Sequence, residues 1–216
     1  MNNSDIRQPE DELQYIRKII EESRAAFVEN GKIYILWGLI MAIGMGVTYL
    51  SFLLNRNLDT GYVWIALILL GWIMMIMLYR ARKHKGQRAK SIIERIDTAI
   101  WGACGGAIGL LVIIFMLNYH YDPSSSFFST LFDTISPFVI SFFSAIILGI
   151  AFYLSGIVNQ IRWLRNLSFV WWAGAAAMFL WPSIHVFGLY ALMLILFQVV
   201  PGIILQRRYH RITIAS

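Results

Sequence analysis

Residues 137–158 read PFVISFFSAIILGIAFYLSGIV and contain no Asp, Glu, Lys or Arg. About 20 apolar residues in a helix cross the roughly 30 Å hydrocarbon core of a bilayer, so this stretch predicts a transmembrane helix. Five further stretches of the same kind lie on either side of it. They cover residues 33–54, 62–79, 99–117, 167–181 and 186–205, of which 167–181 is the shortest.

The composition agrees with a chain that lies mostly in lipid. Hydrophobic residues make up 58% of it, charged residues only 14%, and the mean hydropathy is +0.64, which excludes an ordinary soluble domain. The sequence therefore predicts an all-α polytopic membrane protein with six transmembrane helices. We expect a cytoplasmic amphipathic helix over residues 1–31, the six-helix domain over 32–206 and a cytoplasmic tail over 207–216.

The basic residues predict the orientation. If the six spans alternate in direction, all but one of the 18 Lys and Arg residues fall on the side that holds both termini, and the exception is Arg56. Cytoplasmic loops are enriched in Lys and Arg, so both termini are expected in the cytoplasm. The first 31 residues carry no secretory signal, and the expected location is a bacterial inner membrane.

The segment from Pro9 to Gly31 predicts an amphipathic helix with one apolar face. Its six acidic and three basic residues would be repelled by anionic lipid, which favours a protein surface as its partner. That surface is the chain's own basic loop, a second protein or a second copy. The residues expected to bind it are Leu13, Ile16, Ile20 and Phe27.

The loop after the second span is strongly basic, and the sequence places Glu94 and Asp97 in it as counter-charges. Basic residues next to a membrane gain about 1 kcal/mol each from anionic lipid headgroups. The loop has no interleaved aromatic residues, so lipid is favoured over nucleic acid. The residues expected to bind headgroups are Arg80, Arg82, Lys83, Lys85, Arg88 and Lys90.

Small residues recur at helical spacing in the first, third and fifth spans, where they would allow close approach of helix backbones. We therefore expect these three helices to form the centre of the bundle. The residues are Gly38, Ala42, Gly46, Gly102, Gly105, Gly106, Gly109, Ala173 and Ala177. Trp37, Trp101 and Trp172 occupy similar places in the same spans, which suggests three related hairpins or, alternatively, the usual enrichment of Trp at interfaces.

Few residues point to chemistry. The spans hold Gln198 and the single cysteine, Cys104, but no visible catalytic set, metal motif or cofactor motif. Residues 118–136 have room for a short interfacial helix. Near the outer surface, a group of ionisable residues would bind zinc if they converged, although solvated loop residues explain them more simply: His120, Asp122, Asp133 and His185.

The sequence alone thus favours a non-enzymatic membrane protein that acts as a regulator, sensor or assembly subunit through its cytoplasmic face. The alternative is a transport component for a small neutral or apolar molecule, which a six-helix bundle can enclose. A third hypothesis, an outer-surface metal-dependent lipid enzyme, requires His120, Asp122 and His185 to converge.

Overall fold

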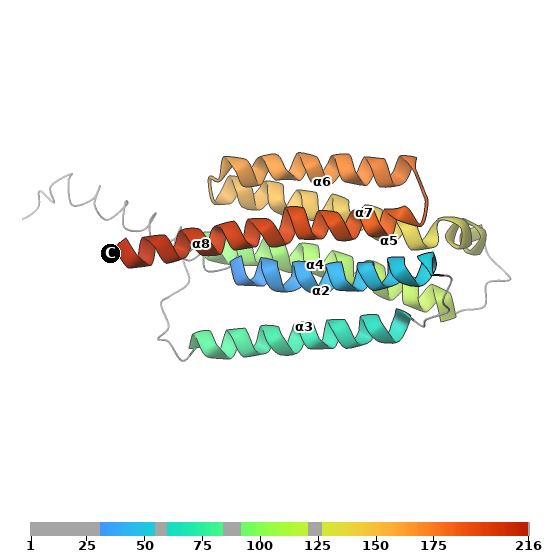
Figure 1. Ribbon diagram of the computed structural model, residues 1–216, viewed down its shortest axis with the longest axis horizontal. Coiled ribbons are helices and arrows are strands. Elements are labelled where there is room, and N and C mark those ends of the chain that lie inside the picture. Colours follow the sequence, from blue (N-terminus) through green and yellow to red (C-terminus); the bar gives the residue numbers. More distant parts are fainter. Residues whose placement is uncertain (1–30, 55–59, 84–91, 121–126, 216) are drawn as a thin grey trace, which may run out of the picture.

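The computed structural model describes residues 31–54, 60–83, 92–120 and 127–215, and these residues form helices without any strand. Figure 1 shows the helices running side by side along one long axis. In chain order they are α2 (Gly31–Leu53), α3 (Thr60–Lys83), α4 (Ile92–His120), α5 (Phe127–Val158), α6 (Arg162–Leu180), α7 (His185–Leu194), the π-helix η2 (Ile195–Val199) and α8 (Val200–Ala215).

Four segments of the described chain are long and apolar enough to cross a membrane: Gly31–Leu53, Arg95–Ile114, Phe138–Val158 and His185–Arg207. They correspond to the first, third, fourth and sixth predicted spans. The second span appears as the shorter apolar segment Tyr62–Leu78. The fifth lies in α6, whose polar first turns, with Arg162, Arg165 and Asn166, leave a shorter apolar part.

The last span continues through η2 into α8, so residues 207–215 prolong a helix. Pro201 lies just after the π-turn. A proline has no N–H to donate, and its ring clashes with the carbonyl four residues earlier, here that of Phe197. Within the wide turn, the Val200 N–H instead bonds the Ile195 carbonyl, five residues back. The π-turn thus accommodates the proline within one long helix.

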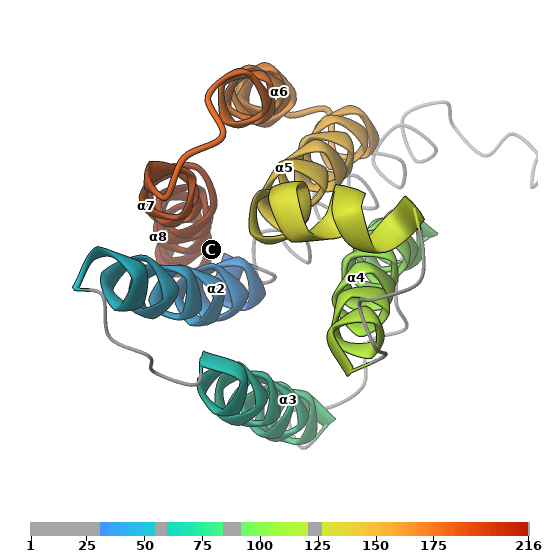
Figure 2. The same ribbon diagram turned by 90° about the vertical axis from the view of Figure 1, so that its right-hand side faces the viewer.

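α5 is longer than a single span because it begins at Phe127, inside the segment for which the sequence predicts a short helix. Its first turns lie across the end of the bundle (Figure 2). α5 contains Pro137, which removes one helical hydrogen bond and favours a kink.

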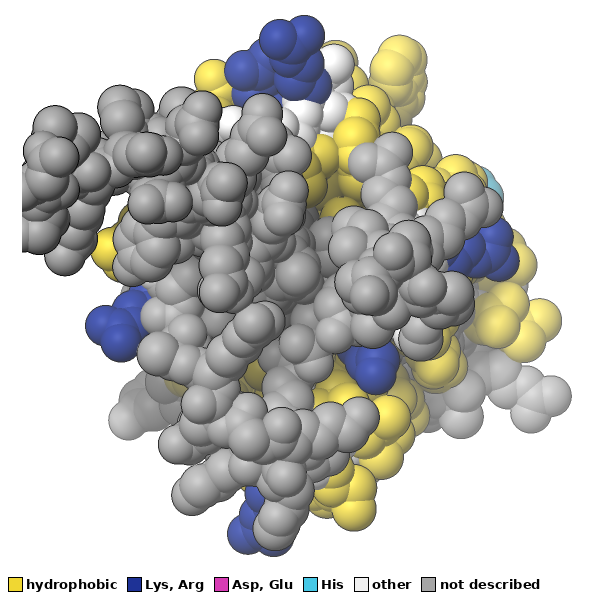
Figure 3. Space-filling model, turned by 90° about the vertical axis from the view of Figure 1, so that its left-hand side faces the viewer, with side chains coloured by type: hydrophobic (Ala, Val, Ile, Leu, Met, Phe, Trp, Pro, Cys, Tyr) yellow, Lys and Arg dark blue, Asp and Glu magenta, His cyan; other side chains and the backbone are white. Residues whose placement is uncertain are grey.

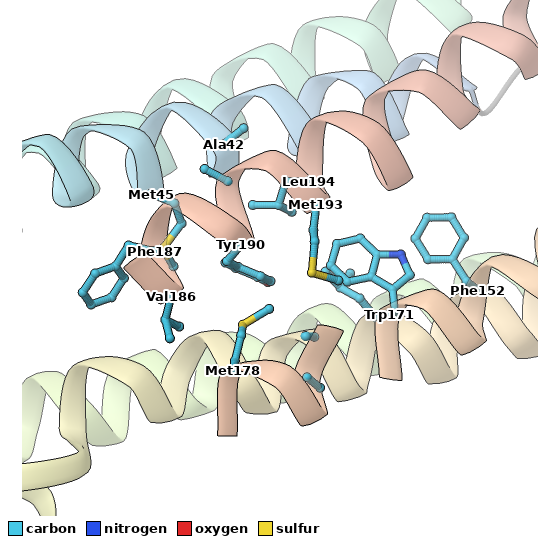
Figure 4. Packing of buried hydrophobic residues seen from close by; sticks show 14 of the residues in the cluster. Ala42, Met45, Phe152, Trp171, Met178, Val186, Phe187, Tyr190, Met193 and Leu194 are labelled. Carbon is cyan, nitrogen blue, oxygen red and sulfur yellow. The ribbon is translucent and has the colours of Figure 1, made fainter. Parts of the chain in front are cut away.

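The core lies between α2, α5, α6 and α7 (Figure 4). It is built from large side chains: Phe152, Trp171, Met178, Tyr190 and Leu194 are all 1% exposed or less. Lipid removes most of the hydrophobic drive between helices, so these contacts stabilise the bundle mainly through close packing.

The first, third and fifth spans do not form this centre together, so that prediction was wrong: α2 and α6 contribute to the core, but α4 lies outside it. α4 packs chiefly on α5, α6 also packs chiefly on α5, and α2 packs on α3, α7 and α8. Gly38 contacts Gln198 and Val199, and Ala42 is buried in the core. Small residues permit a close approach, but they do not specify which helix makes it.

The rest of the small-residue set lies away from the core. Among the described atoms, none comes within 4 Å of a Cβ built at Gly46, Gly102, Gly105, Gly106 or Gly109. Ala173 is exposed and Ala177 is half-buried. Their role in helix packing stays a prediction.

The three matching tryptophans pack in two different ways. Trp37 and Trp101 contact the next helix of their own hairpins, at Trp72 and Phe152 respectively. Trp172 instead packs back on α5, where its Nε1 donates to the Ile146 carbonyl at 3.3 Å. The third hairpin therefore departs from the arrangement that the other two share.

Candidate functional site

A buried carboxylate lies at the end of the bundle where α4 begins. Asp97 is 2% exposed, and it is the sole acidic residue whose side chain belongs to the described part of the structure. The sequence predicts Asp97 as a counter-charge within the basic loop. The loop assignment was wrong because α4 starts at Ile92 and carries Asp97 into contact with α5.

Two side chains at the end of α5 and in the turn after it hold this carboxylate. The Ser155 hydroxyl donates to Asp97 Oδ1 at 2.6 Å, and the Asn159 side-chain amide donates to the same oxygen at 3.2 Å. Asn159 also donates to the Ser155 carbonyl at 2.9 Å, which fixes its amide in place. Hydrogen bonds to a charged acceptor are among the stronger ones.

The contact between the two helices is reciprocal. Trp101 follows Asp97 by four residues, as Asn159 follows Ser155, so each pair lies on one face of its helix. Trp101 Nε1 donates to Ser155 Oγ at 2.9 Å. The indole, hydroxyl and carboxylate thus form a chain of hydrogen bonds, in which each bond polarises the next.

Aromatic rings enclose the chain on the side of the core. Tyr34 from α2 packs edge-on against Trp101, with 4.6 Å between ring centroids. Phe152 lies 5.3 Å from Trp101 and 5.7 Å from Tyr34 by the same measure. Tyr34 and Phe152 are buried, and together the rings separate Asp97 from the middle of the bundle.

The turn between α5 and α6 positions Asn159. α5 ends at Val158, Gln160 has a φ of 54° in the left-handed region, and the Ile161 N–H bonds the Gly156 carbonyl at 2.9 Å. A Cβ at Gly156 would lie 2.5 Å from the Arg165 backbone nitrogen, so a side chain there would push the two helices apart. Glycine therefore allows the tight turn that brings Asn159 to Asp97.

This arrangement can join two helices. Asp97 on α4 accepts hydrogen bonds from Ser155 and Asn159, so the site can fasten the start of α4 to the end of α5. Ionisable groups within membrane spans are expensive and usually functional, which makes Asp97 the leading candidate for a functional residue.

Basic side chains mark the same end of the bundle. All six Lys and Arg residues whose side chains are described are exposed there, and Figure 3 shows them as separate groups around that face. They are Lys32, Arg80, Arg95, Arg162, Arg165 and Arg207. Of the predicted headgroup-binding residues, Arg80 is among these, while Lys85, Arg88 and Lys90 lie outside the described residues. Arg82 and Lys83 belong to α3, without described side chains.

Two other predicted sites fall mainly outside the described chain. The four apolar residues of the N-terminal segment do so entirely: Leu13, Ile16, Ile20 and Phe27. Of the outer ionisable group, His185 is described, and its Nδ1 lies 3.0 Å from the Tyr49 hydroxyl. Asp122 lies outside the described residues, as do the side chains of His120 and Asp133. Within the described part, no three His, Cys, Asp or Glu residues gather as for a metal.

Sequence reasoning missed the Asp97 site although a signal was present. Asp97 and Trp101 share one helical face, and so do Ser155 and Asn159 near the same end of the next helix. A carboxylate paired with an indole, opposite a hydroxyl paired with an amide, predicts complementary hydrogen bonding between neighbouring spans.

Comparisons with known proteins add nothing to this geometry. No family model, curated protein or solved structure matches the chain. The function is therefore argued from the arrangement of its residues.

Proposed function

We propose that this chain is a six-span integral membrane protein, with both termini in the cytoplasm, which acts as a non-enzymatic regulator, sensor or assembly subunit. The six described basic side chains at one end support this orientation, because cytoplasmic surfaces are enriched in Lys and Arg. A bacterial inner membrane is the proposed location.

The observation that carries the proposal is the Asp97 contact. The basic loop of residues 80–95 leads into α4, and Asp97 fastens the start of that helix to α5. A partner that binds the basic loop would therefore act on α4 directly. Through Ser155 and Asn159, the same displacement would reach α5, which also packs against α6 and α7.

α4 is suited to such a role because it is weakly embedded in the bundle. Only 6% of its apolar segment is buried, compared with 44% for α2 and for α5 and 50% for the last span. A helix with few contacts moves at lower cost than one inside the core. The close-packed core between α2, α5, α6 and α7 favours this function over transport through the bundle.

Affinity purification from native membranes tests the proposal. We expect the full chain to capture a partner that is lost when residues 1–31 are removed and captured more weakly by Asp97→Ala. Tyr49→Phe is the matched control, because it breaks a hydrogen bond at the opposite end. The same set of co-purifying proteins from all four chains would contradict the proposal.

A further inference from the structure

A second polar group lies deep in the bundle, apart from Asp97. Tyr190 on α7 and Ser144 on α5 are both fully buried, at 0% exposure. The Ser144 hydroxyl lies beside that of Tyr190, within reach of a hydrogen bond. Neither hydroxyl, however, makes a hydrogen bond of acceptable geometry to another described group.

Two unsatisfied hydroxyls are costly in this position. A buried polar group without a partner loses its hydration and gains nothing in return, and surrounding lipid offers no donor or acceptor. Native interiors usually resolve such a deficit with ordered water, which makes about three hydrogen bonds to groups that are otherwise unsatisfied.

Ser141 supplies a third hydroxyl nearby. It precedes Ser144 by three residues on α5, is also fully buried, and has only the weak acceptor Met45 Sδ as an identified partner, at 3.9 Å. Three hydroxyls can each donate or accept, so the group matches the bonding capacity of water.

The walls limit the size of a ligand. The Trp171 ring lies 6.2 Å from that of Tyr190, measured between centroids, and Met178 and Met193 extend into the same region (Figure 4). A Cβ at Gly174 would overlap the Met193 side chain, so the packing is already tight. These close-packed, apolar walls leave no place for a bulky or charged ligand.

We propose that Ser141, Ser144 and Tyr190 form an internal hydrogen-bonding site that binds ordered water. Phe152 lies between this site and the Asp97 group, since its ring contacts both Trp101 and Trp171. The water site is therefore separate from the Asp97 contact and does not depend on the proposed function.

Hydroxyl-radical labelling of the purified full chain in lipid nanodiscs tests the proposal. X-ray radiolysis produces radicals from bound water in place, and mass spectrometry measures the labelling rate of each residue relative to the unfolded chain. We expect Tyr190 and Met178 to be labelled several-fold faster than Phe152, which is equally buried. Labelling rates at Tyr190 and Met178 as low as that of Phe152 would overturn the proposal. This result is obtained with the native protein and does not depend on the folding of any variant.

Two variants sharpen the test. Ser144→Ala should lower labelling at Tyr190, whereas Ser168→Ala should leave it unchanged, because the buried Ser168 hydroxyl is already bonded to the Arg165 carbonyl at 2.6 Å. Tyr190→Phe should lower the midpoint of thermal unfolding. A higher unfolding midpoint for Tyr190→Phe would indicate that the Tyr190 hydroxyl is dry and unsatisfied. Equal labelling of Tyr190 in the native protein and in Ser144→Ala would show that the radicals come from water bound elsewhere. Either result would overturn the proposal.

Discussion

Among single residues, Asp97 makes the contact that most clearly holds α4 against α5. Its carboxylate accepts hydrogen bonds from Ser155 and Asn159 across the α4–α5 interface. Replacing it by alanine leaves two buried donors without an acceptor, and each such group costs about 1–3 kcal/mol. The stability of the protein should therefore depend on this one side chain more than on exposed polar residues.

Asp97→Ala is expected to lower the free energy of unfolding by at least about 1–3 kcal/mol. Asp97→Asn should cost less, because its carbonyl oxygen can still accept from Ser155. Unfolding in one fixed detergent measures both changes. Tyr49→Phe, which removes a bond to the exposed His185, is the control. An Asp97→Ala protein as stable as the control would show that the carboxylate does not hold the helices together.

Gly156 and Gly102 form a matched pair for a second prediction. A Cβ at Gly156 would collide with the Arg165 backbone, which has no room to move, whereas one at Gly102 meets no described atom. Gly156→Ala should destabilise the protein by about 1–3 kcal/mol, the usual cost of overpacking. Gly102→Ala should be neutral or slightly stabilising, because alanine favours helix. Equal unfolding midpoints for the two variants would argue against the tight α5–α6 turn.

At the scale of the elements, the α5–α6 turn carries backbone strain that can be relieved. Gln160 has a φ of 54°, which costs a non-glycine residue roughly 1–2 kcal/mol. Gln160→Gly should therefore raise the free energy of unfolding by up to about 1 kcal/mol, less the entropy that glycine loses on folding. Gln206→Gly, inside α8, is the control and should lower it. Destabilisation by Gln160→Gly would contradict the left-handed turn.

The face of α4 allows a prediction about its surroundings. Gly105 has no described neighbour, whereas Ala145 on α5 is fully buried. In a Cys104→Ser background, a spin label at Gly105→Cys should be mobile and accessible to oxygen dissolved in lipid. A label at Ala145→Cys should be immobile and inaccessible. Electron paramagnetic resonance in nanodiscs measures both, and an immobile label at Gly105 would mean that another chain covers α4.

For the whole molecule, the orientation can be tested from its two ends. Arg165 and Lys32 lie at the basic end, and His185 lies at the start of α7, at the other end (Figure 1). Single cysteines at Arg165 and Lys32 should react with a membrane-impermeant maleimide only from the cytoplasmic side. A cysteine at His185 should react only from the outside. Labelling of Arg165→Cys and His185→Cys from the same side would contradict the six-span topology.

Much of the fold could be predicted from the sequence because apolar length determines where helices form. All six predicted stretches lie within helices of the structure, apart from their last residues at Leu54 and Trp181, and four of the helical segments have the length and composition to cross a membrane. The packing could not be predicted in the same way. Gly102 and Gly105 have helical spacing but no described neighbour, whereas the core forms around Trp171 and Tyr190.

The candidate site was missed for a related reason. A carboxylate lowers the mean hydropathy of its segment, so a hydropathy pattern predicts that the span begins after Asp97 and that Asp97 belongs to the basic loop. Its burial depends on Ser155 and Asn159, which lie about 60 residues away along the chain and become neighbours only when α4 packs on α5. Complementary polar pairs on adjacent spans carry this information, but hydropathy averages do not.

The central claim is that Asp97 fastens the start of α4, at the basic end of the bundle, to its neighbours. The most direct measurement is the distance between spin labels at Arg95→Cys and Arg162→Cys, both exposed, in a Cys104→Ser background in nanodiscs. Double electron–electron resonance should give one narrow distance distribution with Asp97 present. With Asp97→Ala, the distribution should broaden or shift as α4 separates from α5. The same narrow distribution in both proteins would contradict the claim.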